Sequence, residues 1–104
     1  MNLNTIQINN LTEAFLMLKN QAEMKKFLRD LLTENEIKEF ARRWQAARML
    51  DEKNSYIAIV KKTGLSSTTV ARISKWLQNG MGGYRLLLTR LHHHNSTLTG
   101  KGLS

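Results

Sequence analysis

The chain has 104 residues and no cysteine, which fits one small domain and excludes disulfide bonds and thiolate metal sites. It has no apolar run of membrane-spanning length and no signal-peptide pattern at its N-terminus, so we expect a cytoplasmic protein. Residues 1–52 carry eight of the 16 basic and all eight acidic side chains, so the whole net charge of +8 belongs to residues 53–104. Because a carboxylate would repel phosphate, this asymmetry favours a polyanionic partner over a merely solvated face.

The N-terminal part predicts an arm followed by two short helices. Residues 1–9 are polar with isolated aliphatic side chains, and we expect an N-terminal arm there. From about residue 10 to 19, apolar residues recur with helical spacing. Asn20 can cap the second helix, and Glu23 follows it at the favourable position three residues later.

The longest predicted helix begins at a capping box. Thr33 and Glu36 have the spacing at which each side chain accepts a hydrogen bond from the other residue's amide. The helix continues to about residue 52, because one face carries regularly spaced apolar residues, namely Ile37, Phe40, Ala41, Trp44, Ala47 and Leu50. A polar break follows, and Ser55 at its end can cap the next helix.

Two short helices are predicted to meet at Gly64. Glycine just beyond a helix can adopt the left-handed conformation that ends it, and Ser66 can cap the helix that follows. In that second helix Val70, Ile73 and Leu77 fall on one face at spacings of three and four. This pattern is typical of a helix-turn-helix, although corners of this kind also serve packing alone.

The opposite face of the second helix has the side chains that a DNA-recognition helix needs. Short hydroxyl donors lie near its N-terminus, and long cations follow them. We predict that one set faces the groove, comprising Ser67, Thr68, Arg72 and Lys75. A second set is predicted to hold phosphates and comprises Ser66, Thr69, Lys61 and Lys62.

After this helix the sequence Asn79-Gly80-Met81-Gly82-Gly83 predicts a flexible break. A last helix is expected from Tyr84 to Leu91, followed by a flexible polar tail over residues 92–104. The predicted fold is therefore all-α, with about six helices and a helix-turn-helix domain over residues 10–91. The terminal helices carry more apolar surface than a chain of this size can cover, which favours a homodimer.

No catalytic or metal site can be assembled from the sequence. The three histidines, His92, His93 and His94, are consecutive and point in different directions on a helix, so they do not converge on one metal ion. No nucleophile–base set or phosphate-binding glycine loop is present. We therefore expect no enzyme activity, no metal and no cofactor.

The order of these parts resembles the Trp repressor superfamily over roughly residues 10–91. The closer similarity is to its YerC/YecD-type branch, through the segments Leu31-Leu32-Thr33, Arg42-Arg43-Trp44, Gly64-Leu65-Ser66 and Thr69-Val70-Ala71-Arg72. The resemblance implies an intertwined helical homodimer that binds double-stranded DNA at a palindromic operator. It also implies transcriptional regulation, with repression as the expected effect.

The resemblance also implies a candidate vestigial ligand pocket. Two arginines that hold tryptophan in the Trp repressor match Arg43 and Arg72, and Thr33 matches a residue near that pocket. Here, however, Ile73 stands in place of a glycine, and Trp76 stands near a serine that contacts the ligand. Because these larger side chains would fill the pocket floor, we expect DNA binding that does not require tryptophan.

One alternative of a different class remains open at this point. A helical adaptor could dock the same basic half on an acidic protein partner. A DNA titration at two salt concentrations separates that alternative from a DNA-binding regulator.

Overall fold

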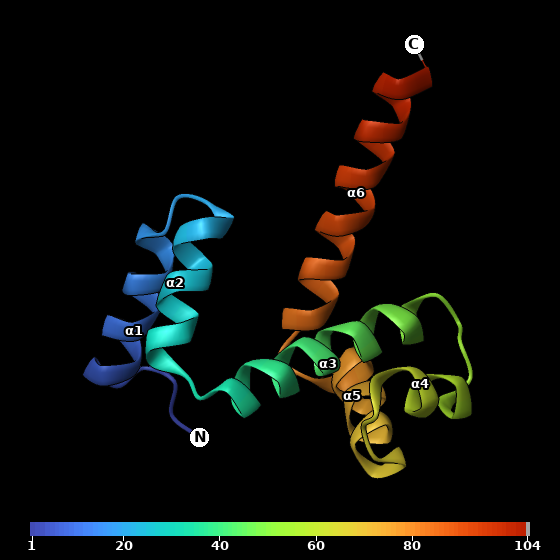
Figure 1. Cartoon of the computed structure of the whole chain (residues 1–104), viewed down its shortest axis with the longest axis horizontal. Coiled ribbons are helices and arrows are strands. Elements are labelled where there is room, and N and C mark those ends of the chain that lie inside the picture. The colour runs from blue at the N-terminus through green and yellow to red at the C-terminus, as the bar shows by residue number, and fades with distance from the viewer. Residues whose placement is uncertain (104) are drawn as a thin grey trace. The chain divides into compact units, whose positions relative to one another are not determined.

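The structure is a computed structural model that describes the backbone of residues 1–103 and the side chains of residues 1–95. Within the described backbone there are six helices and no strand, which confirms the predicted all-α class (Figure 1). The helices are α1 (Ile6–Met17), α2 (Gln21–Leu31), α3 (Glu34–Asp51), α4 (Tyr56–Thr63), α5 (Ser67–Asn79) and α6 (Gly83–Leu103). Of the helices described, none combines the length and the apolar character that a membrane span needs.

The chain divides into two compact units, residues 1–38 and residues 39–104. In the first unit, the expected arm over residues 1–9 is wrong in its second half, because α1 already begins at Ile6. Thr5 is the cause, since its side chain accepts a hydrogen bond from the amide of Ile8 at 3.2 Å and caps the helix. Between α1 and α2, Phe15 and Phe27 pack edge to face with ring centroids 5.4 Å apart.

The predicted caps of α2 and α3 are confirmed. Asn20 accepts from the amide of Glu23 at 2.9 Å at the start of α2. At the start of α3, Thr33 and Glu36 form the reciprocal pair, with distances of 2.9 and 3.2 Å. Two hydrogen bonds with Thr33 hold the pKa of the exposed Glu36 carboxyl below its ordinary value, and the bond from the backbone amide has the larger effect.

The core of the second unit forms where α3, α4 and α5 meet. Its fully buried members include two alanines on the C-terminal half of α3, which bring little side-chain bulk to the contact. The other members come from α4, from the turn and from α5, so the corner and the long helix share one core. The buried set is Ala46, Ala47, Ile59, Leu65, Val70 and Ile73.

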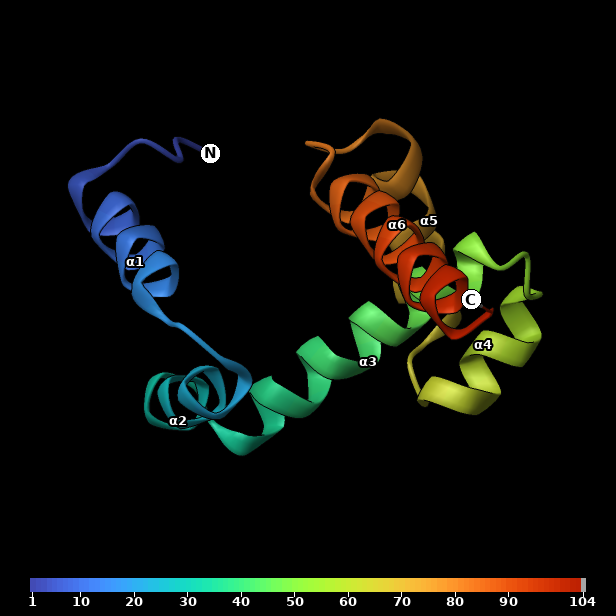
Figure 2. The same ribbon diagram turned by 90° about the horizontal axis from the view of Figure 1, so that it is seen from above.

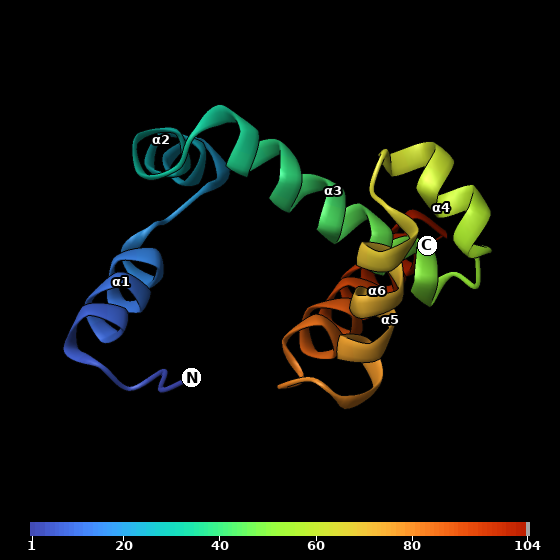
Figure 3. The ribbon, with the colours of Figure 1, turned by 90° about the horizontal axis from the view of Figure 1, so that it is seen from below.

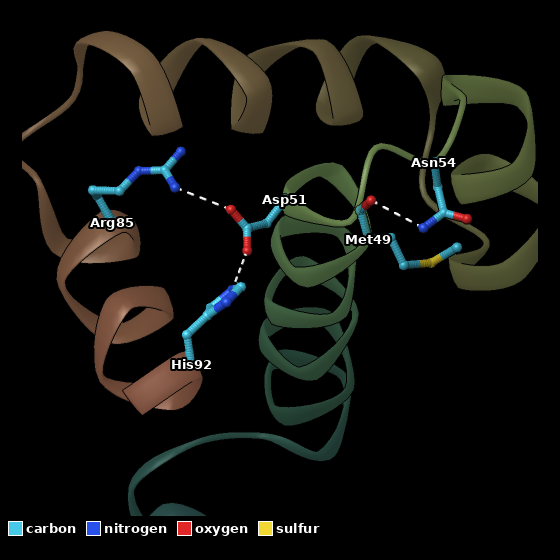
Figure 4. Close-up of polar contacts among 5 residues, drawn as sticks. All are labelled: Met49, Asp51, Asn54, Arg85 and His92. Atoms are coloured by element: carbon cyan, nitrogen blue, oxygen red, sulfur yellow. Dashed lines mark hydrogen bonds and ion pairs between the residues drawn. The ribbon is translucent and has the colours of Figure 1, made fainter. Parts of the chain in front are cut away.

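The end of α3 is a Schellman motif built without glycine. The amide of Lys53 donates to the carbonyl of Leu50, and the amide of Asn54 to that of Met49, both at 3.0 Å. The side-chain amide of Asn54 reaches the same Met49 carbonyl at 3.0 Å (Figure 4). This motif requires a left-handed residue, and Lys53 supplies it with φ 67°, which is unusual for a residue with a side chain.

The last helix extends beyond its predicted end at Leu91. α6 continues to Leu103, because the polar sequence after Leu91 has no proline and reaches residue 100 before its first glycine. His92, which we expected in a solvated tail, instead bonds to Asp51 at the end of α3. The rest of the tail prediction for residues 92–104 lies partly outside the described residues, which exclude Ser104 and the side chains from residue 96 onwards.

Candidate nucleic-acid interface

The chain turns a corner between α4 and α5 (Figure 3). Three local devices set the ends of these two helices, as predicted. Ser55 caps α4 by accepting from the amide of Ala58 at 3.2 Å. Gly64 ends α4 in the left-handed conformation, with φ 76° and ψ 6°. Ser66 caps α5 by accepting from the amide of Thr69 at 3.1 Å. The direction in which α5 leaves the corner is therefore set by backbone geometry and capping.

Thr63 adds a buried polar contact that the sequence analysis did not identify. Its hydroxyl donates to the carbonyl of Ile59 at 2.7 Å and accepts from the amide of Leu65 at 3.2 Å. The side chain thus satisfies one backbone group on each side of Gly64 while it remains buried itself. Its position directly before the glycine was the available signal, because threonine can bond back to the preceding turn of a helix.

Most of the predicted DNA-contacting side chains lie in solvent and are available to a partner. On α5, Ser67, Thr68, Arg72 and Lys75 are exposed, and no ion pair or side-chain hydrogen bond engages them among the described residues. The exposed lysines of α4, Lys61 and Lys62, extend this basic surface across the corner. Their contact with DNA remains a prediction, but the structure leaves all six free to make one.

Ser66 and Thr69 are arranged differently from the other predicted phosphate contacts. The hydroxyl of Ser66 donates to that of Thr69 at 3.0 Å, and its oxygen accepts the capping bond. Its proton is therefore already engaged. The half-buried Thr69 accepts that bond and keeps its own hydroxyl proton, so of this pair Thr69 is the available donor to a phosphate.

Two exposed apolar side chains lie at the start of α4, beside the basic surface. Ile57 is 76% exposed and precedes Lys61 by one helical turn, which places both on one face of α4. Tyr56, its neighbour, is 43% exposed. Neither residue was predicted to belong to the interface, since both occupy ordinary apolar positions of a short helix.

The residues of the candidate ligand pocket come from separate elements of the chain, and their convergence on one pocket stays a prediction. Thr33 belongs to the first unit, where its side chain serves the capping box. Arg43 and Arg72 belong to the second unit, and Arg72 is exposed while Arg43 is half-buried. The Nε of Arg43 is buried and has no hydrogen-bond partner within the described part of the chain. This orphaned donor can still make a hydrogen bond to a partner that reaches it.

An aromatic pair lies near Arg43. The rings of Trp44 and Tyr84 are nearly parallel, at 8°, with centroids 6.4 Å apart, and they join α3 to the start of α6. Burial raises the pKa of the Tyr84 hydroxyl, and the positive charge of Arg43 partly opposes that rise. The phenol therefore remains neutral and can donate a hydrogen bond at physiological pH.

The two positions that depart from the Trp repressor pattern differ in their burial. Ile73 is fully buried within the core of the second unit, as its place on the apolar stripe predicted. Trp76 is 42% exposed, so within one chain its indole does not fill a pocket floor as we expected. The reason is its angular position, since Trp76 lies at the edge of the buried stripe, one turn after the exposed Arg72.

No group of three or more histidine, aspartate or glutamate side chains in the described part of the chain could hold a metal ion. Of the three adjacent histidines, His92 has its own partner in Asp51. What the geometry offers is an exposed cationic and hydroxylated helix on a rigid corner, which is chemistry for binding a polyanion.

Comparison with known proteins assigns this arrangement to a family. The family model described as Trp repressor protein matches residues 6–92. The chain is 38% identical over 85 residues to the uncharacterized protein YerC of Bacillus subtilis (strain 168), a match that covers 82% of each chain.

Two crystal structures are similar to this chain over most of its length. One is of a TrpR-like protein from Eubacterium eligens ATCC 27750, with a TM-score of 0.83, 37% identity, and coverage of 86% of this chain and 93% of that one. The other is of a candidate Trp repressor from Staphylococcus aureus, with a TM-score of 0.81, 33% identity, and coverage of 86% and 90%. The chain therefore belongs to the Trp repressor family, whose members are regulatory DNA-binding proteins and not enzymes.

Proposed function

We propose that this protein is a cytoplasmic transcriptional repressor that binds a palindromic DNA operator as a homodimer. The observation that carries the proposal is the free, exposed set of donors on α5, in a half of the chain that has no carboxylate. Hydroxyls at the start of a recognition helix and cations further along it match base edges and phosphates in a major groove. Because the second half of the chain has no acidic side chain, it brings no carboxylate that would repel the DNA phosphates.

Exposed apolar side chains support the homodimer. They lie on the terminal helices and on the first half of α3, outside the core of the second unit. A surface of this kind is usually covered by a partner, and a second copy also places two recognition helices on a two-fold site. The exposed set on these helices is Ile6, Leu11, Leu16, Met17, Phe40, Leu86 and Leu87.

A DNA titration over a series of salt concentrations tests the proposal. The site is first selected from random or genomic fragments, and its affinity is then measured by fluorescence anisotropy. Each phosphate contact should lower the slope of log affinity against log salt by roughly 0.9. With four to six cations placed by each subunit, the slope should be steep, and the selected site should be an imperfect palindrome with half-sites roughly 34 Å apart.

Three outcomes would count against the proposal. They are a flat salt response, a selected site without two-fold symmetry, and a monomer in sedimentation at the concentrations used. If no DNA binds but an acidic protein does so in a salt-dependent way, the adaptor alternative is favoured.

We further propose that L-tryptophan is not a corepressor of this protein. A corepressor acts only if it binds the DNA-competent arrangement better than the alternative, and this needs space beside α5. Ile73 occupies that position with no exposed surface, and moving its side chain into water would cost about 1.5–3 kcal/mol. We expect the same DNA affinity with and without millimolar tryptophan, and no saturable heat in calorimetry. Saturable uptake together with several-fold tighter DNA binding would refute this.

A further inference from the structure

Asp51, the last residue of α3, is held by two side chains of α6 (Figure 4). Arg85 donates from Nη1 to Oδ1 at 3.0 Å, and His92 donates from Nε2 to the other oxygen, Oδ2. The side chain of Asp51 is 13% exposed, while those of Arg85 and His92 are 54% and 64% exposed. The bond from His92, and then that from Arg85, hold the pKa of Asp51 below its ordinary value. Asp51 is therefore the enclosed member of this three-residue group, which we call the Asp51 clamp.

The clamp holds α6 at two points on one face. Arg85 and His92 are seven residues apart, which is two turns of helix, so their side chains leave the same side of α6. Leu88 lies between them and is 1% exposed. A buried apolar contact with a charged contact on either side fixes the rotation of a helix about its own axis, because any turn breaks one of the three.

The clamp also borders the recognition helix. Asp51 and Arg85 line a cavity of about 150 Å³ together with Ser74, Leu77 and Gln78, which belong to the C-terminal half of α5. The fully buried residues of α5, Val70 and Ile73, lie in its first seven positions, so its C-terminal half has no fully buried residue of its own.

The connection from α5 to α6 cannot hold this half of the helix by itself. The connection can be followed between α5 and α6 in Figure 2. It contains Gly80 and Gly82, with φ 88° at Gly82, and it ends at Gly83, the first residue of α6. Glycine is the residue with the greatest conformational freedom, so a glycine-rich connection restrains its neighbours little. The orientation of this half of α5 therefore depends on where α6 is held as well as on the buried residues in the first half of the helix.

We propose that Asp51 is a positioning residue for DNA reading: it holds α6 to the end of α3 and thereby fixes the C-terminal half of α5. This inference rests on the proposed DNA-binding function. Lys75 is the predicted groove contact in the region that the clamp steadies, and Arg72 lies just before it. Loss of the clamp should therefore reduce affinity for the preferred site more than affinity for unrelated DNA, which is held through phosphates alone.

Charge alone predicts the opposite change in DNA affinity, so the sign of the change distinguishes the two explanations. Asp51→Ala removes a negative charge from a protein that binds a polyanion, so charge alone predicts tighter binding. The clamp predicts weaker binding. The matched control is Glu52→Ala, which changes the net charge equally at the next residue, where the exposed side chain has no ion pair with any described residue.

We expect Asp51→Ala to lower affinity for the selected site about tenfold, while Glu52→Ala leaves it unchanged or slightly tighter. Asp51→Asn keeps the shape and a hydrogen-bonding oxygen and has the same charge as the alanine variant, so it should recover most of the loss. His92→Gln should lose affinity in part, whereas His94→Gln, two residues further along α6, should not. Hydrogen exchange should show faster exchange at residues 80–83 in Asp51→Ala, with the amides of the core unchanged.

The outcomes separate this inference from the proposed function. If the wild type binds no DNA, the proposed function fails before any variant is compared. If the wild type binds and Asp51→Ala behaves like Glu52→Ala, the inference is wrong and the function stands. A loss that is equal on preferred and unrelated DNA, or one that Asp51→Asn does not recover, also overturns it. Should the alanine variant fail to fold, the Asp51→Asn, His92→Gln and His94→Gln comparisons decide the question.

Discussion

Lys53 and Gly64 form a natural pair for measuring what a left-handed residue costs this fold. Both end a helix with positive φ, 67° at Lys53 and 76° at Gly64. One position has a side chain and the other has none. We predict that Lys53→Gly stabilises the protein and that Gly64→Ala destabilises it, because the side-chain β-carbon is unfavourable in this conformation.

The expected magnitudes follow from two opposing terms. A β-carbon in the left-handed region costs roughly 1–2 kcal/mol, while glycine loses about 0.5–1 kcal/mol more conformational entropy on folding. The net gain for Lys53→Gly is therefore about 0.5–1 kcal/mol, and Gly64→Ala should lose a similar amount. A β-carbon added at Gly64 would meet no atom within 4 Å, so that loss isolates the backbone term.

Thermal unfolding at one fixed protein concentration measures both changes. At roughly 4–8 °C per kcal/mol for a domain of this size, Lys53→Gly should raise Tm by about 2–8 °C. Lys53→Ala is the control, because it removes the same ammonium group but keeps the β-carbon, and it should leave Tm nearly unchanged. If the glycine and alanine variants have the same Tm, the gain does not come from backbone strain and the reasoning is refuted.

Two further predictions concern the interface and the clamp. Arg72→Ala should cost about 1–3 kcal/mol on the preferred site and relax selectivity at one base position, whereas Lys62→Ala should weaken binding to all sequences alike and reduce the salt slope by about one. Binding of each protein variant to a library of DNA sites with single-base changes checks this. If Arg72→Ala and Lys62→Ala give identical profiles, Arg72 contacts the DNA phosphate backbone and not a base. In the Asp51 clamp, the bonds from His92 and Arg85 lower the pKa of Asp51 in the folded state. The stability that these bonds contribute is therefore present above the ordinary aspartate pKa of about 3.9, and it is lost as the pH falls through the lowered pKa. The difference in urea midpoint between wild type and Asp51→Asn should therefore shrink on acidification from pH 6 to pH 3, and a constant difference would contradict it.

The features that sequence predicted well are those set within a few residues. The caps at Asn20, Thr33, Ser55 and Ser66 each depend on an amide three residues away, so the spacing alone is sufficient. Gly64 is equally local, because its conformation is a property of the glycine. The buried stripe of α5 follows from helical periodicity, which the chain must satisfy in any packing.

The features that sequence missed depend on distant partners. Asp51 and His92 are 41 residues apart, and nothing near either one announces the other. The polar residues after Leu91 suggested a tail, but polarity sets solvation and does not by itself end a helix. In the last helix Leu88 is 1% exposed and the neighbouring Leu87 is 52% exposed, because the side of a helix that is buried depends on what packs there.

The Asp51 clamp also affects which charged side chains contribute to the surface that would meet DNA. Asp51 and Glu52 are the last acidic residues before the basic half, so they are the carboxylates closest in sequence to the helix-turn-helix. A carboxylate near bound DNA would repel phosphate, yet the Asp51 carboxylate is bonded by Arg85 and His92 and exposes 13% of its side chain. Arg85 is correspondingly engaged within the chain, so it neutralises an internal acid and does not add to the surface that meets DNA. Among the residues with described side chains, the cations of Lys61, Lys62 and α5 have no such partner, and they are the ones whose charge a bound polyanion would experience in full.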